Sequence, residues 1–301
     1  MKKVIISGAT GALGMALIRQ LTQEGSQILV LSHEYSSRNN RLDQYPDITI
    51  IPCSLQQLAS VQNPTGQNWD VFYHFAWAGT TGAARNDMYL QNLNVRYALD
   101  AVDAASRFGC HTFIGSGSQA EYGRFEGKLT PETPAFPDNG YGIGKLAAGM
   151  MTREYAHQKG LRHLWVRILS LYGPYDGSQS LVMSTISQLK QGISPQCTLG
   201  KQLWDYLFSQ DAACAFSRMG DSSFDGKTYV LGSGKVRPLA DYIEDMRKIV
   251  SADTPVKLGA IPYSPRQVMH LEADISDLIE DFGWRPVTDF TDGIRQILPY
   301  I

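Results

Sequence analysis

The feature that most constrains this chain is a short apolar run near its start that leads directly into three evenly spaced glycines. The run Val4 to Ser7 is followed by Gly8-Ala9-Thr10-Gly11-Ala12-Leu13-Gly14, and an amphipathic stretch begins at Ala12. A strand, a glycine turn and a helix in this order place backbone N–H groups and the positive end of a helix dipole beside an anion. The GxxGxxG spacing alone is weak evidence for a phosphate-binding loop, but its place directly after the first strand makes that evidence specific. The sequence therefore predicts a pyrophosphate-binding loop.

Short apolar runs alternate with amphipathic stretches through the first half of the chain. The runs lie at 4–7, 27–32, 48–51, 71–76, 111–116 and 163–169. Runs of this kind suit parallel strands covered on both faces, and several intervening segments have the length of crossover helices. Helices are expected at Ala12 to Glu24, about Asp87 to Phe108, and about Tyr141 to Gln158. We predict an α/β fold with a doubly wound parallel sheet, the Rossmann architecture.

The pattern of the sequence changes after Tyr172-Gly173-Pro174-Tyr175. From there on the predicted helices and strands are shorter, and Pro and Gly are more frequent. We therefore expect a Rossmann domain over residues 1–171 and a smaller C-terminal α+β lobe over residues 172–301 that binds substrate. Some segments of the second part are allowed to return to the Rossmann sheet. The absence of a repeat or a free linker predicts that the two parts pack as one unit.

Composition narrows the possible partners. Lys and Arg number 27 against 29 Asp and Glu, so no long-range field would gather a nucleic acid or an anionic membrane. The apolar stretch at the start is too short for a signal-peptide core or a spanning helix, which predicts a cytoplasmic protein. The 4 cysteines are scattered and the 6 histidines form no ligand motif, so no metal is expected.

The end of the second predicted strand bears on the choice of cofactor. It reads Leu31-Ser32-His33-Glu34 and is followed by Arg38 and Arg41. An acid at the strand end would bind a ribose 2′-hydroxyl and repel a 2′-phosphate, whereas a small Ser with nearby arginines leaves room for that phosphate. NADP is therefore preferred over NAD. The alternative is that the arginines are solvated and Glu34 reads the ribose of NAD.

Tyr141 and Lys145 are four residues apart on a predicted helix, so both side chains leave the same face. A nearby ammonium favours the ionised form of a tyrosine hydroxyl and draws its pKa towards the range useful for proton exchange with a carbonyl or alcohol. Tyr155 and Lys159 repeat the spacing near the end of the same helix, and we discount them for that reason. The first pair is the candidate acid/base unit.

Upstream, a strand carries Ser116-Gly117-Ser118-Gln119-Ala120-Glu121-Tyr122-Gly123 to the edge of the sheet where doubly wound folds bind their ligands. With these residues the chain resembles an extended short-chain dehydrogenase/reductase, the branch that contains nucleotide-sugar epimerases, dehydratases and reductases. The resemblance implies that Ser118 is the catalytic Ser/Thr, that Tyr141 is the acid/base and that Lys145 holds the nicotinamide ribose.

The resemblance extends over nearly the whole chain. It includes His74-Phe75-Ala76 (HxA), Asn94-Val95 (NV), Arg167 to Pro174 (RxxNxYGP), Gly200 to Asp211 (GxxxRD[FY]xxVxD), Arg266 (RPGD) and Gly283 to Pro286 (LGWxP). The residues expected to bind the cofactor are Gly8, Thr10, Gly11, Ala12, Leu13, Gly14, Ser32, Arg38, Ala76, Ala78, Asn94, Ser116 and Lys145.

In such proteins the small lobe binds the nucleoside diphosphate of a sugar, and Arg266 is the candidate for its phosphates. Substrate contacts are expected from Gln119, Ser170, Trp204, Asp205 and Arg266. Two of these depart from the family pattern, because Ser170 replaces an Asn and Trp204 replaces a phosphate-contacting Arg. The departures leave the identity of the sugar nucleotide open.

The resemblance leaves several functions to weigh. A 4,6-dehydratase needs an acid and a carboxylate after the catalytic Ser/Thr, and those places hold Gln119 and Ala120, while Glu121 on a continuing strand would point to the opposite face. We therefore favour an NADPH-dependent reductase of an NDP-4-keto-6-deoxyhexose. The alternatives are an NDP-hexose 4-epimerase with tightly bound NAD, another carbonyl reductase of this branch, and, of a different class, a non-catalytic NADP(H)-binding sensor or scaffold.

A homodimer is also expected. The helices from Asp87 and from Tyr141 carry apolar residues that could form a four-helix bundle with a second copy, as the resemblance implies. The residues predicted to face outward are Leu93, Tyr97, Ala101, Leu146 and Met150. The same stripes could instead face the sheet, the commoner fate of an amphipathic helix.

Overall fold

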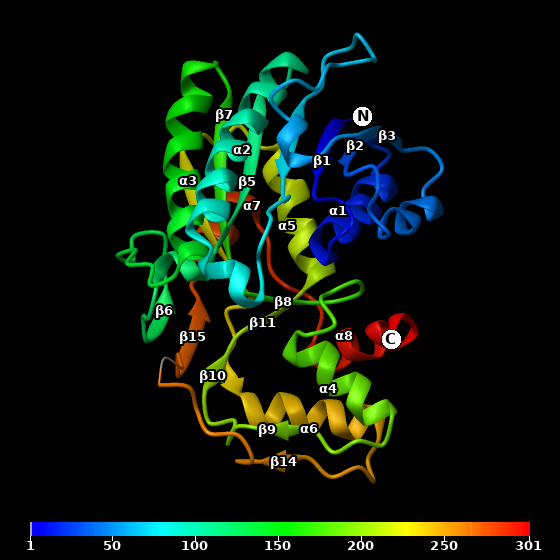
Figure 1. Cartoon of the computed structure of the whole chain (residues 1–301), viewed down its shortest axis with the longest axis vertical. Coiled ribbons are helices and arrows are strands. Elements are labelled where there is room, and N and C mark those ends of the chain that lie inside the picture. The colour runs from blue at the N-terminus through cyan, green and yellow to red at the C-terminus, as the bar shows by residue number, and fades with distance from the viewer. Residues whose placement is uncertain (1, 266) are drawn as a thin grey trace.

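The structure is a computed structural model, and it describes residues 2–265 and 267–301. Its larger lobe is built on seven parallel strands, β1 (Lys3–Ser7), β2 (Gln27–Ser32), β3 (Thr49–Pro52), β4 (Val71–His74), β5 (Thr112–Ser118), β7 (Arg162–Ile168) and β12 (Lys227–Leu231). In space they follow the order β12-β7-β5-β4-β1-β2-β3 (Figure 1). The predicted doubly wound α/β fold is confirmed.

Helices cover both faces of this sheet. One face carries α1 (Ala12–Gln23), α5 (Ser209–Asp221) and α7 (Ser276–Phe282), and the other carries α2 (Met88–Arg107) and α3 (Gly140–Gln158) (Figure 1). Along β1, Val4 and Ile6 belong to the core beneath α1, whereas Ile5 belongs to the core beneath α2. Because both faces are covered, the strands read as unbroken apolar runs rather than as alternating ones.

The ends of the predicted helices have physical caps. The Asp87 side chain accepts a hydrogen bond from Leu90 N and opens α2, and Asn139 does the same for Gly142 N and opens α3. Gly160 follows α3 with a φ of +70°, a conformation that side chains with a Cβ avoid. The helices predicted from the sequence therefore begin and end within a residue or so of the observed bounds.

The fifth strand is longer than the run predicted at 111–116, because β5 continues through Ser118. A Cβ on Gly115 or Gly117 would collide with the Trp165 indole of neighbouring β7. Glycine at both places leaves room for that ring beside the strand. The strand therefore carries Ser116 and Ser118 to the carboxyl edge of the sheet.

The smaller lobe packs three helices, α4 (Leu181–Lys190), α6 (Leu239–Val250) and α8 (Phe290–Ile297), around a core of its own. Its strands are β6 (Gly127–Leu129), β8 (Ser170–Tyr172), β9 (Gln196–Cys197), β10 (Leu203–Trp204), β11 (Tyr206–Phe208), β13 (Arg237–Pro238), β14 (Lys257–Leu258) and β15 (His270–Ala273). One sheet follows the order β13-β10-β15-β6, and β8 pairs with β11 and β9 with β14.

The chain crosses between the lobes more than once. After residue 172, α5, β12 and α7 return to the larger lobe, while β6 leaves it early to pair with β15. A single boundary at residue 171 therefore does not divide the structure. The repeated crossings fix one lobe against the other.

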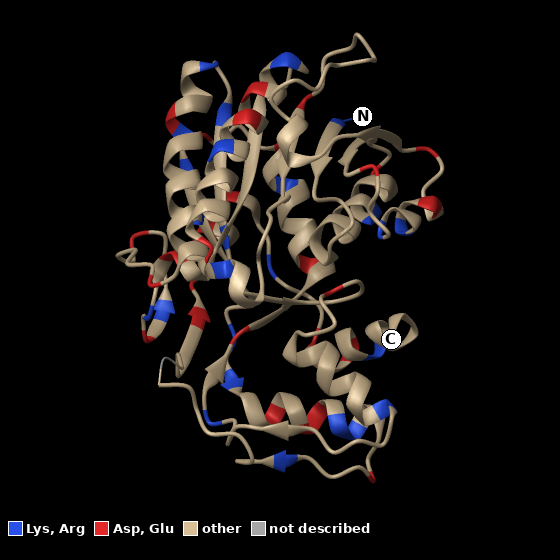
Figure 2. Cartoon of the chain, in the orientation of Figure 1, with Lys and Arg blue, Asp and Glu red and all other residues tan. Residues whose placement is uncertain are grey.

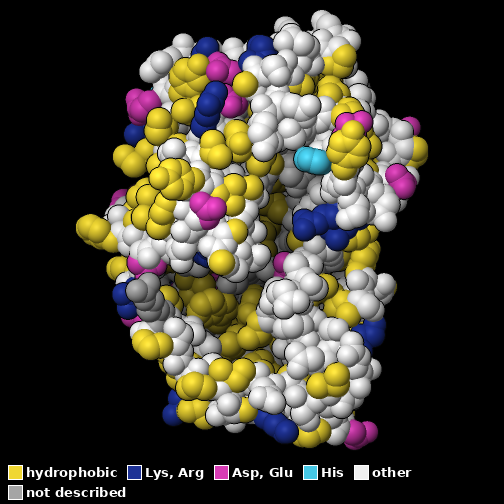
Figure 3. Space-filling model, viewed as in Figure 1, with side chains coloured by type: hydrophobic (Ala, Val, Ile, Leu, Met, Phe, Trp, Pro, Cys, Tyr) yellow, Lys and Arg dark blue, Asp and Glu magenta, His cyan; other side chains and the backbone are white. Residues whose placement is uncertain are grey.

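Acidic and basic residues are interspersed over both lobes (Figure 2). The molecule is hollowed between the lobes, and hydrophobic side chains line the hollow on the side of the small lobe (Figure 3). None of the helices that the structure describes has the length and apolar character needed to cross a membrane. The strand order reverses at β1, so its carboxyl end and that of β4 open onto the place where such folds bind ligands.

Candidate active site

The loop between β1 and α1 is closed tightly at two glycines and open at the third. Gly8 has a φ of +76°, and a Cβ there would lie 2.5 Å from Ala76 N. A Cβ on Gly14 would lie 2.5 Å from the carbonyl oxygen of Gly8. Gly11 has a φ of −82°, and the nearest atom to a Cβ there is the Gly8 carbonyl oxygen, at 3.8 Å. The loop can therefore receive a ligand only over Gly11.

The open side of this loop has the chemistry of a pyrophosphate site. Gly11 is the N-cap of α1, and no side chain of the described residues caps this helix. Its first N–H groups are therefore available to an anion. Gly11 and Ala12 line a cavity of about 960 Å³ together with Arg38 and Arg41. These residues fit the pyrophosphate of a dinucleotide cofactor.

Two other loop residues have different surroundings. Leu13 belongs to the core beneath α1, so only its backbone faces the loop. The Thr10 carbonyl accepts a hydrogen bond of 2.6 Å from Arg41 Nη1. Arg41 also lies 4.9 Å from the ring centroid of Tyr175. Arg41 thus ties the loop to the start of the small lobe.

Two polar side chains, Ser32 and Asn39, bond to each other at the end of β2. The Ser32 hydroxyl donates to Asn39 Oδ1 at 2.6 Å, so a neutral amide stands near the place where an acid would read the ribose. Arg38 and Glu34 are both exposed, and Arg38 lines the cavity with Arg41. Two guanidinium groups therefore border this end of the site.

Lys145 and Ser116 meet at the carboxyl edge of β5. Lys145 Nζ donates to the Ser116 carbonyl at 2.7 Å, and the Ser116 hydroxyl donates to the His74 carbonyl at 3.2 Å. Lys145 Nζ also lies 4.0 Å from the ring centroid of Trp77. Burial lowers the pKa of Lys145 to about 7. The lysine is therefore held by a carbonyl and an indole rather than by a carboxylate.

Asn94 shapes the segment that follows β4. Ala78 N donates to Asn94 Oδ1 at 3.0 Å, and Asn94 Nδ2 donates to the Ala78 carbonyl at 2.8 Å. Both functional groups of this amide bond to backbone. Ala76, on the same segment, packs against Gly8 of the pyrophosphate loop. Asn94 thus holds the segment in place beside the loop.

Ser118 and Tyr141 are brought together although a loop separates them in sequence. The Tyr141 phenol has the Ser118 side chain and the Arg85 guanidinium as neighbours. Burial raises the pKa of Tyr141, and these two neighbours lower it. Arg85 lies 4.3 Å from the Tyr141 ring centroid and Lys145 lies 5.9 Å from it. The nearer cation is therefore not the lysine expected from the spacing.

The second Tyr-Lys pair lies at the far end of α3. The Tyr155 hydroxyl donates to Asp103 Oδ1 at 2.9 Å, and Lys159 Nζ pairs with the same oxygen at 2.8 Å. This pair joins α3 to α2 and has no serine beside it. The geometry favours the first pair as the candidate acid/base unit.

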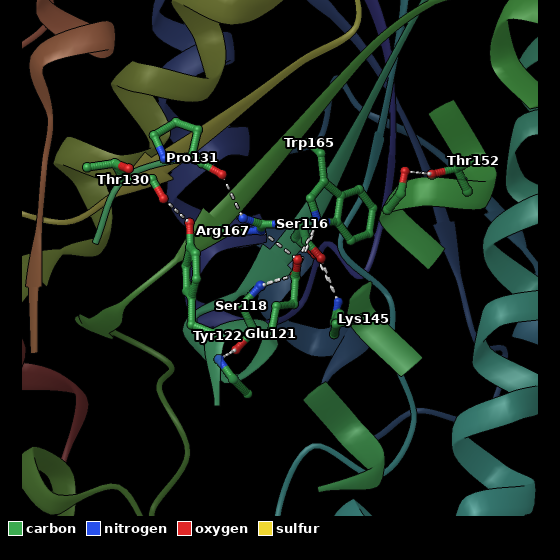
Figure 4. A network of polar contacts seen from close by, with 12 residues as sticks. Ser116, Ser118, Glu121, Tyr122, Thr130, Pro131, Lys145, Thr152, Trp165 and Arg167 are labelled. Atoms are coloured by element: carbon green, nitrogen blue, oxygen red, sulfur yellow. Dashed lines mark hydrogen bonds and ion pairs between the residues drawn. The ribbon is translucent and has the colours of Figure 1, made fainter. Parts of the chain in front are cut away.

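A buried ion pair between Glu121 and Arg167 lies next to Ser118 (Figure 4). Glu121 is wholly buried, and its carboxylate accepts from Ser118 N at 2.7 Å, from Trp165 Nε1 at 3.1 Å and from Arg167 Nε at 2.8 Å. Burial raises the pKa of Glu121, and the Arg167 guanidinium opposes that rise. The interpretation of Glu121 as a strand residue on the opposite face is wrong. The chain turns into the 3₁₀ helix η4 (Gln119–Tyr122) directly after β5. This turn places the Glu121 carboxylate within hydrogen-bond distance of Ser118 N.

The small-lobe candidates have unequal surroundings. Trp204 Nε1 donates to the Ser170 hydroxyl at 2.8 Å, so the two departures from the family pattern contact each other. Both line a cavity of about 420 Å³.

Gln119 is half-buried at the start of η4, directly after Ser118. Arg266 lies outside the described residues.

Asp205 does not lie where a substrate contact is expected. Its side chain has no exposed surface, and it accepts from Ser233 N at 2.6 Å, Gly234 N at 3.0 Å and Ala273 N at 3.1 Å. These bonds tie together loops that are far apart in the chain. The structure therefore corrects this prediction, because the carboxylate serves the packing of the lobe and does not line its cavity.

Two residues at this site were not identified from the sequence. Trp77 lies beside Lys145, and its place directly after an apolar run at the sheet edge is a signal that could have found it. Arg85 lies in a short 3₁₀ helix between β4 and α2, where no periodicity or motif of the sequence marks it. Only the folded chain brings its guanidinium to Tyr141.

Similarities to known proteins agree with this geometry. The dTDP-glucose 4,6-dehydratase of Xanthomonas campestris is 27% identical over 183 residues, which span 58% of this chain and 52% of that protein. The chain thus spans about half the length of this relative. The CDP-abequose synthase of Salmonella typhimurium is 22% identical over 309 residues, which span 98% of this chain and 97% of that protein.

Solved structures share the whole fold. The UDP-N-acetylglucosamine 4-epimerase of Methanobrevibacter ruminantium superposes with a TM-score of 0.88 at 20% identity, covering 99% of this chain and 97% of that one. The RMD protein of Pseudomonas aeruginosa, solved with NADPH, superposes with a TM-score of 0.82 at 20% identity. The superposition covers 99% of this chain and 98% of that one. At these identities the likeness describes the fold.

The model of the NAD dependent epimerase/dehydratase family matches residues 4–232. That range contains the pyrophosphate loop, the serine at the end of β5 and the Tyr-Lys pair of α3. The chain therefore belongs to the NAD dependent epimerase/dehydratase family.

Proposed function

We propose that this protein is an NADPH-dependent reductase of the 4-keto group of an NDP-4-keto-6-deoxyhexose. The observation that carries the proposal is the convergence of Ser118, Tyr141 and Lys145 at the carboxyl end of β5, on the same edge of the sheet as the glycine loop after β1. When bound, the nicotinamide cofactor supplies the hydride for such a reduction. The protein supplies a proton, an orientation for the carbonyl and a site shielded from water.

The residues divide that work in a way that their contacts support. Tyr141 donates its phenolic proton to the carbonyl oxygen as that oxygen gains negative charge. Ser118, which neighbours the phenol, donates to the same oxygen and fixes its position. The Glu121 and Arg167 pair holds the backbone of Ser118. The chain thus presents one proton donor and one orienting hydroxyl.

Water elimination of the dehydratase kind is a poorer match. The two positions after Ser118 are the amide Gln119 and the buried Ala120, and neither exchanges protons. The nearby carboxylate of Glu121 is engaged by Ser118 N, Trp165 and Arg167. This arrangement supports reduction or epimerisation over elimination, although similar proteins from Xanthomonas campestris and Mycobacterium tuberculosis carry a dehydratase name.

The purified protein should oxidise NADPH in the presence of an NDP-4-keto-6-deoxyhexose and should bind NADPH more tightly than NADH in calorimetric titration. The reason is that Arg38 and Arg41 border the cavity where Ser32 and Asn39 replace an acid. Arg38→Ala should weaken NADPH binding by about tenfold to a hundredfold, the cost of one charge-assisted bond, and leave NADH binding unchanged. Arg153→Gln, on the outer part of α3, is the matched control.

Other results would point to the alternatives. Copurified NAD that cannot be exchanged, together with interconversion of NDP-hexoses, would indicate a 4-epimerase. Cofactor binding without turnover of any keto sugar would indicate a sensor or scaffold. Saturation-transfer NMR with UDP, dTDP, GDP and CDP would identify the base, and failure of all four to bind would contradict a nucleotide-linked substrate.

We also propose a homodimer through the outer faces of α2 and α3. A groove of about 580 Å³ runs between them, lined by Leu99, Met150, Met151 and Tyr155 among others. Leu93 and Met150 are exposed, as predicted for an outward face, but Tyr97 and Ala101 are buried against the sheet. Their assignment to the outer face was wrong, because they lie on the stripe of α2 that packs onto the core.

Light scattering at micromolar concentration should therefore report a dimer. Met150→Glu would place a charge in the apolar groove and should shift the protein towards a monomer without changing its thermal stability by more than a few degrees. Arg153→Gln on the same helix should leave the mass unchanged. A monomeric wild-type protein would contradict the proposed dimer.

A further inference from the structure

Arg85 is fixed beside Tyr141 by contacts of its own segment. It lies in the 3₁₀ helix η3 (Gly82–Asn86), and its Nη1 donates to the Thr80 carbonyl at 2.8 Å. The next residue, Asn86, accepts a hydrogen bond from Gly140 N at 3.1 Å through Oδ1. The first bond holds Arg85 to its own segment, and the second ties η3 to the first turn of α3, which carries Tyr141. The guanidinium carbon therefore rests 4.3 Å from the centroid of the phenol ring.

The other charged groups around Tyr141 are already committed to partners. Lys145 donates to the Ser116 carbonyl and faces the Trp77 ring. Glu121 is paired with Arg167 under Ser118. Asp138, just before α3, pairs with Arg124 at 3.2 Å, and Asp87 caps α2. Arg85 is the nearest cation to the ring that is not paired with a carboxylate among the described residues.

The two cations near the phenol also differ in how they respond to pH. Burial lowers the pKa of Lys145 to about 7, so in the protein alone its charge is incomplete near neutrality. A guanidinium stays protonated throughout the range in which proteins are folded. Arg85 is half-buried, which limits screening of its field by water. The cation that lies over the face of the Tyr141 ring is therefore that of Arg85.

We propose that Arg85 is a positioning residue for the acid/base tyrosine: its guanidinium, stacked on the ring, stabilises the tyrosinate and holds the phenol towards Ser118. The inference rests on the proposed role of Tyr141 in proton transfer. In reduction, the phenol would give its proton to the substrate oxygen, and a bound nicotinamide cofactor would supply the hydride for the carbon. The negative charge left on Tyr141 then lies beneath the guanidinium, where a cation over an aromatic face is attracted most strongly.

The direct test follows the ionisation of Tyr141 without any substrate. The full-length protein, labelled with fluorotyrosine, is titrated by fluorine NMR, and the Tyr141 signal is identified by its loss in Tyr141→Phe. In Arg85→Gln the titration midpoint should rise by about half to one pH unit, and Arg85→Lys should restore most of the shift. Arg295→Gln, an exposed arginine on α8, is the control. An unchanged midpoint in Arg85→Gln would overturn the inference.

Kinetics separate this inference from the proposed function. Reduction requires the protonated phenol, so Arg85→Gln should extend activity to higher pH. Alcohol oxidation requires the tyrosinate, so in that direction the same variant should lose about three- to tenfold of its rate at neutral pH and recover it at alkaline pH. A pH profile identical to that of wild type in both directions would refute the role of Arg85. Full activity of Tyr141→Phe would refute the proposed function instead, whatever the titration of Arg85→Gln shows.

Discussion

Tyr141→Phe should abolish hydride transfer and leave cofactor binding nearly unchanged. The substitution removes only the hydroxyl that neighbours Ser118, while the ring keeps its place between Arg85 and Trp77. Loss of a general acid typically costs about 10²–10⁴-fold or more in rate. Stopped-flow absorbance of the nicotinamide measures the chemical step, and calorimetry measures the affinity for NADPH.

Tyr155→Phe is the matched control for this variant. It removes a hydroxyl from the same helix, but one that bonds to Asp103 on the outer side of α2. We expect its turnover to match that of wild type. Equal losses in the two variants would mean that α3 tolerates neither change for structural reasons, and full turnover in Tyr141→Phe would end the assignment of the acid/base.

Gly11→Ala should remove most of the affinity for the dinucleotide without destabilising the fold. The backbone of Gly11 already has an ordinary φ, and a Cβ there would meet its nearest neighbour at 3.8 Å. The added methyl would instead occupy the open side of the loop, where an anion approaches the first N–H groups of α1. Losing one such charge-assisted bond weakens binding by about tenfold to a hundredfold.

Gly14→Ala should, in contrast, destabilise the fold. A Cβ there would lie 2.5 Å from the carbonyl oxygens of Gly8 and Ala9, so the backbone of the loop or of α1 would have to move. Overpacking of this kind costs about 1–3 kcal/mol, which thermal denaturation would register. Together the two variants distinguish the glycine over which the ligand would lie, Gly11, from the glycine that allows the loop to pack closely, Gly14. Tight NADPH binding by Gly11→Ala would show that the pyrophosphate does not lie over this residue.

Much of the fold could be predicted because its signals are local. The unbroken apolar runs of β1, β2 and β7 report coverage on both faces, and the glycines of the first loop report a turn that a Cβ would block. The spacing of Tyr141 and Lys145 on one helix is likewise readable from neighbouring residues. Each of these features depends on the backbone geometry of a single segment.

What the sequence by itself determined is therefore the class of the fold and the glycine turn between β1 and α1, and it supplied the candidate acid/base pair. The tertiary structure alone decided which cation lies on Tyr141, that Glu121 supports Ser118, and that Ser170 and Trp204 bond to each other. These contacts join residues far apart in the chain, and no periodicity or spacing encodes them. They form only when separate strand ends and loops meet at one edge of the sheet, because the packing of whole elements, not local propensity, sets which side chains become neighbours.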